Sequence, residues 1–163
     1  MRLLGFPSSA RAVGLDLGHS SVKIVEMEGN RLTRWAAVDL PGGAIQNGII
    51  RDIAAVAGCV RRAAETAGLR GATVHAAVSG AACVVRRLRL PALGPRDLAH
   101  AIRWEAERLL PYPFAEAVVD YRVLGRPPGP GDGQVDVVVA GVRTDVLNGY
   151  AAAIEGAGLR VGT

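Results

Sequence analysis

The sequence contains few of the residues from which disulfide-rich, metal-binding or membrane-spanning proteins are built. Its two cysteines, Cys59 and Cys83, have no metal-site spacing, and each stands in an apolar run, so we expect buried free thiols and a reducing compartment. No run approaches the ~20 apolar residues of a membrane span. The segment Met1–Pro7 is too short for the apolar core of a signal peptide. Any association with a membrane is therefore expected to occur through partners.

The usual catalytic constellations are also missing. The three histidines, His19, His75 and His100, are scattered along the chain. No Ser/His/Asp set, HExxH motif, Walker loop or paired-carboxylate site is recognisable. The sequence therefore shows no recognisable catalytic site of these classes.

Half of the 163 residues are apolar, enough for one domain or two small lobes with a real core. The charged fraction of 21% excludes a disordered or coiled-coil composition. The net charge of +4 could attract nucleic acid or anionic lipid. Because the arginines are spread out, with clusters only at Arg61-Arg62 and Arg86-Arg87-x-Arg89, we favour solvated arginine faces.

One stretch, Val13 to Glu26, organises the chain. Alternating apolar residues predict two strands joined by a tight turn from Gly18 to Ser21. Glycine permits close approach of a ligand, and the turn residues Gly18, His19, Ser20 and Ser21 are candidates to cradle an anion. Asp16 could hold a water of bound Mg²⁺, and Lys23 could meet a phosphate. The alternative is an ordinary hairpin with an exposed lysine.

The remaining patterns predict a mixed α/β protein. Gly29-Asn30 predicts a two-residue hairpin turn, and Asp52 predicts the N-cap of a helix that ends at Ala67-Gly68-Leu69. The expected order is β-β-β-α-β followed by β-α-β-β-α-β. The expected strands are 13–17, 22–28, 31–40, 73–79, 83–90, 117–125 and 134–142, and a further strand starts at Arg160. The expected helices run from Asp52 to Ala67, from Pro95 to Leu110 and from Thr144 or Asp145 to Ala157, and residues 126–133 are expected to form a mobile loop.

The strand 83–90 and the helix after it carry the second set of candidates. Val84, Arg86, Leu88 and Leu90 share one side of the strand, where an arginine needs a carboxylate, a carbonyl or a strand end. On the helix, Trp104 is expected either in a core on a second face or as an anchor for a partner. Leu88 has the same two alternatives, core residue or wall of a peptide groove.

The motifs together resemble the type IV pilus assembly protein PilM family, an FtsA-like branch of the actin-like ATPase superfamily, over its N-terminal part. The most specific segment is the helix from Ala101 to Tyr112, with its Trp-Glu-Ala-Glu sequence and terminal proline. The resemblance is carried by four segments: Gly14–Lys23, Arg87–Pro91, Ala101–Tyr112 and Ala157–Leu159.

This resemblance implies an actin-like, ribonuclease-H-like start of subdomain IA in residues 1–82 and an FtsA-type subdomain IC in residues 83–163. It implies a cytoplasmic scaffold or adapter, peripheral to the inner membrane, that binds the N-terminal tail of the membrane protein PilN between IA and IC. We expect Arg86, Leu88, Leu90, Trp104 and Leu109 to contact that tail.

The family resemblance also implies ATP and Mg²⁺ as ligands of the complete protein, at Asp16, Gly18, His19, Ser20, Ser21 and Lys23. His19 departs from the Ser or Thr usual in relatives. The second phosphate loop of such proteins lies beyond Thr163, so we expect weak or absent nucleotide binding, no turnover, and exposed apolar surface that favours self-association.

Three alternatives stay open at this point. The chain could resemble the cytoplasmic part of the type II secretion protein GspL. It could be a nucleotide-binding fragment of an actin-like ATPase or sugar kinase. A nucleic-acid binder is disfavoured, because such sheets carry stacking aromatics and the corresponding strands have only Tyr121.

Overall fold

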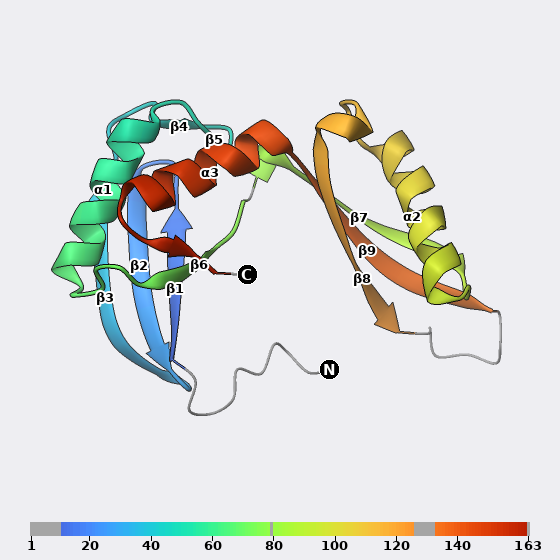
Figure 1. Ribbon diagram of the computed structural model, residues 1–163, viewed down its shortest axis with the longest axis horizontal. Helices are drawn as coiled ribbons and strands as arrows, with labels where there is room; N and C mark the ends of the chain where they lie inside the picture. The colour runs from blue at the N-terminus through green and yellow to red at the C-terminus, as the bar shows by residue number, and fades with distance from the viewer. Residues whose placement is uncertain (1–10, 79, 126–132, 163) are drawn as a thin grey trace. The chain divides into compact units, whose positions relative to one another are not determined.

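A computed structural model describes residues 11–78, 80–125 and 133–162, and the chain divides into two compact units (Figure 1). The first unit comprises residues 1–80 and 148–163, and the second comprises residues 81–147. This division differs from the expected one at the C-terminal end. The reason is that β10 (Arg160–Val161) pairs in parallel with β6 (Thr73–Ala76) of the first unit.

The first unit contains a five-stranded sheet in the order β10-β6-β1-β2-β3. Strands β1 (Arg11–Leu17), β2 (Ser21–Glu28) and β3 (Arg31–Asp39) form the predicted antiparallel set. Gly29 has a φ of 58° in the turn between β2 and β3, as the predicted hairpin requires. β6 ends at Ala76 and is thus shorter than expected.

The caps of α1 (Ile53–Thr66) confirm the sequence prediction. The Asp52 carboxylate accepts a hydrogen bond from the Ala55 amide at 2.8 Å. After the helix, Gly68 has a φ of 66°, and the Leu69 amide donates back to the Ala64 carbonyl at 2.7 Å. The glycine supplies the left-handed conformation that this ending needs, and Leu69 closes the core beneath it.

The end of α3 (Thr144–Gly156) repeats this arrangement. Gly158 has a φ of 81°, and the Leu159 amide donates to the Ile154 carbonyl at 3.2 Å. The Arg61 side chain of α1 donates to the Gly156 carbonyl. The part of α3 that belongs to the first unit therefore lies beside α1.

A short hairpin that the sequence analysis missed precedes α1. β4 (Ile45–Gln46) pairs antiparallel with β5 (Ile49–Ile50). Asn47 and Gly48 between them have φ values of 52° and 75°, which is the conformation that Asn-Gly favours in two-residue hairpins. The Asn-Gly dipeptide was the signal that could have revealed it.

The two faces of the large sheet differ. α1 covers the face from which Val22, Ile24 and Ala36 are buried. On the opposite face, Lys23 and Val25 alternate with these residues, and Val25 is paired with Trp35, which is 65% exposed. Apolar surface is therefore exposed on this face, as expected.

The second unit is a three-stranded antiparallel sheet with α2 (Pro95–Leu109) packed on one face. The strand order is β7-β9-β8, where β7 is Cys83–Pro91, β8 is Ala117–Gly125 and β9 is Gln134–Arg143. α2 begins with Pro95 as predicted. The core consists of Leu90, Leu98, Ile102, Ala106, Val135, Val137 and Val139.

The predicted order β-α-β-β-α-β is present along the chain as β7, α2, β8, β9, α3 and β10, but these elements do not share one sheet. Two short 3-10 turns, Gly80–Ala82 and Phe114–Glu116, complete the elements. Residues 126–132 of the predicted loop and the segment Met1–Pro7 lie outside the described residues. Within the described ranges, no helix is long and apolar enough to cross a bilayer.

Both cysteines are free, but only Cys59 is fully buried. Cys83 is half-buried at the start of β7. The expectation of two buried thiols is therefore correct for Cys59 and wrong for Cys83, because the first residue of β7 lies at the end of its sheet.

Among the residues that the structure describes, Glu26 is the charged residue that is buried, with 1% of its surface exposed. Its carboxylate accepts hydrogen bonds from the Thr33 hydroxyl, at 2.8 Å, and from the Arg11 guanidinium. Arg34 Nε lies 3.5 Å from Glu26 Oε2. Arg34 also donates to the Gly68 carbonyl at 2.9 Å. This cluster joins β1, β2 and β3 to the end of α1.

Burial alone raises the pKa of Glu26, but hydrogen bonds from Thr33 and Arg11 and the charges of Arg11 and Arg34 outweigh it, so the pKa is lowered. A lowered pKa in the folded state means that ionised Glu26 stabilises the fold above the carboxyl pKa of the unfolded chain, about 4.3. This stabilisation is lost as the pH falls through the folded-state value.

We predict that Glu26→Gln lowers the free energy of unfolding by about 2 kcal/mol at pH 7, because two arginines lose their anionic partner. The difference from the wild type should shrink as the pH falls below about 4. Urea unfolding at several pH values measures both effects. The control is Glu28→Gln on the exposed end of the same strand, which should change stability by less than about 0.5 kcal/mol. Equal effects of the two substitutions would contradict the prediction.

Candidate functional site

The turn between β1 and β2 is as tight as its sequence indicated. The Gly18 amide donates to the Ser21 carbonyl at 3.0 Å, and the Ser20 carbonyl accepts from the Leu40 amide at 2.8 Å. A Cβ on Gly18 would lie 3.0 Å from the Ser21 carbonyl oxygen, a tight contact that the turn could accept only by shifting slightly. The closeness of the turn thus favours glycine at this position.

Asp16 and Lys23 lie opposite each other on β1 and β2 and form an ion pair with 3.0 Å between Lys23 Nζ and Asp16 Oδ2. Both side chains are more than half exposed, so the pair contributes little to stability. They line an open hollow of about 620 Å³ together with Gly14, Leu15, Val25, His75, Ala76 and Ala77. The predicted metal and phosphate residues are therefore neighbours.

This pairing limits what the two charges can do. In the observed arrangement each neutralises the other, so a lone anion or a lone cation gains little from the site. A complex of Mg²⁺ with a phosphate could replace the pair by two new ones, the cation on Asp16 and the phosphate on Lys23. The residues present fit such a group from one side.

His19 in the turn is fixed from the side. Its Nδ1 lies 3.1 Å from the Ile45 carbonyl oxygen of β4. A carbonyl only accepts hydrogen bonds, so His19 Nδ1 is the donor in this contact. The neighbouring positions Ser20 and Ser21 complete the turn, with Ser20 exposed and Ser21 half-buried at the start of β2.

The expected partner residues all belong to the second unit, and most lie where α2 covers the sheet. Leu90 belongs to the core, and Leu88 packs against it. Arg86 and Leu109 line a void of only about 10 Å³ between helix and sheet, at most the size of one water. No peptide fits on that side of β7 with α2 in place. Partner contact by Leu88 and Leu90 stays a prediction, and the packing of Leu88 against this core favours the core alternative for that residue.

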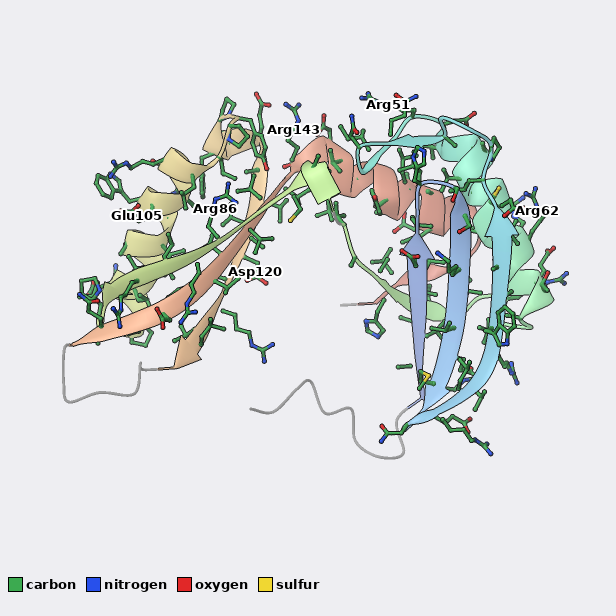
Figure 2. The ribbon with its side chains drawn as sticks, turned by 180° about the vertical axis from the view of Figure 1, so that it is seen from behind. Arg51, Arg62, Arg86, Glu105, Asp120 and Arg143 are labelled. Atoms are coloured by element: carbon green, nitrogen blue, oxygen red, sulfur yellow. The ribbon has the colours of Figure 1, made fainter. Side chains whose placement is uncertain are left out.

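Arg86 has one of the partners that an arginine in this apolar row needs, namely a backbone carbonyl. Its guanidinium donates to the Val85 carbonyl at 2.9 Å, and the side chain is exposed at its end. Figure 2 shows it on β7, with Glu105 on α2. A carbonyl partner and access to water together explain an arginine in an otherwise apolar row.

Trp104 is 60% exposed on α2, so the alternative of a core on a second helix face is wrong. The Arg108 guanidinium lies 5.1 Å from the centre of its ring, within the range of a cation–π contact. Arg103 similarly lies 4.9 Å from the ring of Phe114. Trp104 is thus held in place without being buried, and its role as an anchor for a partner stays a prediction.

Two buried polar groups were missed. Tyr150 of α3 donates its hydroxyl to the Gly48 carbonyl at 3.1 Å. The pKa of Tyr150 is raised by burial and, to a lesser extent, by the negative charge of Asp16. Glu26 was also overlooked, although it continues the buried alternation of Val22 and Ile24. A charged residue at a position where the alternation predicts a buried apolar side chain could have revealed it.

Comparison with known proteins relates this chain to a known family. The family model described as type IV pilus assembly protein PilM matches residues 14–162. A solved structure titled "PilM-PilN type IV pilus biogenesis complex" is 33% identical, with a TM-score of 0.84 over 95% of this chain. The chain spans about half of that relative, 47% of its length.

A second structure, the cytoplasmic domain of EpsL, an inner-membrane component of the type II secretion system of Vibrio cholerae, is 14% identical. Its TM-score is 0.56 over 94% of this chain and 56% of that one, and it shows a shared fold only. A Bacteroides thetaiotaomicron protein with an actin-like ATPase fold and unknown function has a TM-score of 0.42 at 8% identity.

We predict weak or absent binding of Mg-ATP, because one phosphate turn closes over the ligand from one side and Asp16 and Lys23 neutralise each other. Titration calorimetry should give a dissociation constant above about 100 µM, weaker than ~5.5 kcal/mol of binding free energy. Asp16→Ala should change it little. A low-micromolar constant that Asp16→Ala abolishes would refute the prediction.

Proposed function

This chain belongs to the family of type IV pilus assembly protein PilM, and from that premise we propose that it is a scaffold component of the type IV pilus machinery. Its proposed role is to bind the N-terminal tail of a PilN-like inner-membrane protein. The observation that carries the proposal is the 33% identity, over 95% of this chain, to a PilM that is in complex with PilN.

We propose further that the first unit is the start of an actin-like subdomain IA and the second unit an FtsA-type subdomain IC. The order β10-β6-β1-β2-β3, with three antiparallel strands followed by two parallel ones, supports the first assignment. The separate three-stranded sheet with one covering helix supports the second. Because C-terminal β10 returns to the first sheet, the second unit is an insertion within the first.

The second unit offers two features suited to an extended tail. β7 is a nine-residue strand at one edge of its sheet, and an edge strand can pair with an added strand through its backbone. Trp104 is a large exposed side chain of the kind that dominates peptide affinity. Backbone pairing leaves the side chains of Leu88 and Leu90 in their core, so binding requires no opening of α2.

No turnover is proposed for these residues. Phosphoryl transfer needs phosphate, metal and attacking water held together, whereas Asp16 and Lys23 line a hollow that is open to solvent. A cytoplasmic position, with attachment to the inner membrane through the partner, follows from the proposed role. The type II secretion alternative is less favoured, since that likeness is 14% against 33% for PilM.

We predict that Trp104→Ala weakens binding of a labelled PilN N-terminal peptide by about 10- to 30-fold, roughly 1.4–2 kcal/mol, as loss of an aromatic anchor does. Fluorescence anisotropy measures the change. Alanine favours helix at this exposed position, so α2 should remain folded. The matched control is Trp35→Ala, which removes an equally exposed tryptophan from the first unit and should leave affinity unchanged.

Leu88→Glu completes the test. Circular dichroism should show that this variant loses the fold of the second unit, since it buries a charge beside Leu90. If Leu88→Glu stays folded and loses affinity, Leu88 belongs to the partner's groove. If Trp104→Ala leaves the affinity of a peptide that binds the wild type unchanged, the proposed anchor is wrong.

A further inference from the structure

The β4–β5 hairpin touches two elements that are distant in the sequence. At one end, the Ile45 carbonyl accepts the hydrogen bond from His19 in the turn. At the other end, the Gly48 carbonyl accepts the hydrogen bond from Tyr150 on α3. Both bonds use a side chain from outside the hairpin and a backbone carbonyl within it. The hairpin thus lies between the Gly18–Ser21 turn and α3.

The hairpin itself is short and strongly constrained. Its two central residues both have positive φ, and Ala44 and Ile45 are buried, with 4% and 3% of their surfaces exposed. The Ala44 carbonyl accepts from the amides of Arg51, at 2.8 Å, and Asp52, at 3.3 Å. A segment held at both ends and in its turn has little internal freedom, so displacement of one end is transmitted to the other.

We propose that this hairpin is a brace that couples the conformation of the Gly18–Ser21 turn to α3, with His19 and Tyr150 as its positioning residues. The inference depends neither on the pilus role nor on nucleotide binding. α3 begins in the second unit, at Thr144, and ends in the first. A ligand that reshapes the turn therefore acts on a segment through which the chain passes between the units.

The electrostatics of Tyr150 agree with this placement. Its side chain is 4% exposed, and the charge of Asp16 contributes to the raised pKa of its hydroxyl after burial. The field of the carboxylate beside the turn thus reaches the residue that holds α3. Neutralising Asp16 with a cation would change that field at Tyr150.

Amide hydrogen exchange of the whole chain tests the brace. His19→Ala should speed exchange of α3 amides 150–156 by about tenfold, the effect of one lost hydrogen bond. Exchange of α1 amides 57–64 in the same unit should stay unchanged, since α1 has its own caps. His19→Asn, whose amide nitrogen can donate to the Ile45 carbonyl, should restore slow exchange in α3.

The second part of the experiment removes the hydrogen bond at the other end of the hairpin. Tyr150→Phe should speed exchange at residues 19–21, and adding His19→Ala to it should have little further effect on α3. The control is Tyr112→Phe, because the Tyr112 hydroxyl is buried without a hydrogen-bond partner among the described residues. The proposal is overturned if α3 exchange is unchanged in His19→Ala. It is equally overturned if α1 and α3 accelerate together, which would show general loss of stability.

Discussion

The buried carboxylate of Glu26 is the centre of the interactions that join three strands of the first unit to the end of α1. It faces the covered side of the sheet, where an unpaired charge would cost several kcal/mol, and it is matched by Thr33, Arg11 and Arg34. The register of β2 against β3 shifts between Glu26 and Met27, and the Thr33 hydroxyl, which contacts both the backbone and the carboxylate of Glu26, holds that irregularity. Through Arg34 the same cluster fixes the end of α1, so sheet and helix are joined by one anion.

At the other end of β1 and β2, the candidate ligand site depends on a balance of charges. Asp16 and Lys23 are paired across the strands, and His19 is held by β4. The turn is therefore held by its neighbours, and the charges of Asp16 and Lys23 satisfy each other. This combination agrees with the proposed scaffold role, in which the turn supports neighbouring elements. The proposed partner site is instead on the second unit, where β7 lies at the edge of its sheet and Trp104 is exposed.

Local signals in the sequence predicted local structure well. The Asp52 cap, the two Gly-Leu helix endings and the Gly29-Asn30 turn all depend on neighbouring residues, and all are present. The Asn47-Gly48 hairpin was equally local and was missed. The pairing of β10 with β6 could not be predicted, because it joins residues more than eighty positions apart. For the same reason, alternation placed Leu88 and Leu90 on one side of β7 but could not show that α2 covers them.

The central claim is that this chain receives a PilN-like tail on its second unit while the first unit supports it. Mapping of backbone protection on the chain, by hydrogen exchange with and without the tail peptide, tests that claim most directly. The account predicts slower exchange along β7, residues 83–91, and around Trp104 in α2, with β3 unaffected. Protection confined to the first unit, or its absence from β7 and α2 when the peptide is bound, would contradict it.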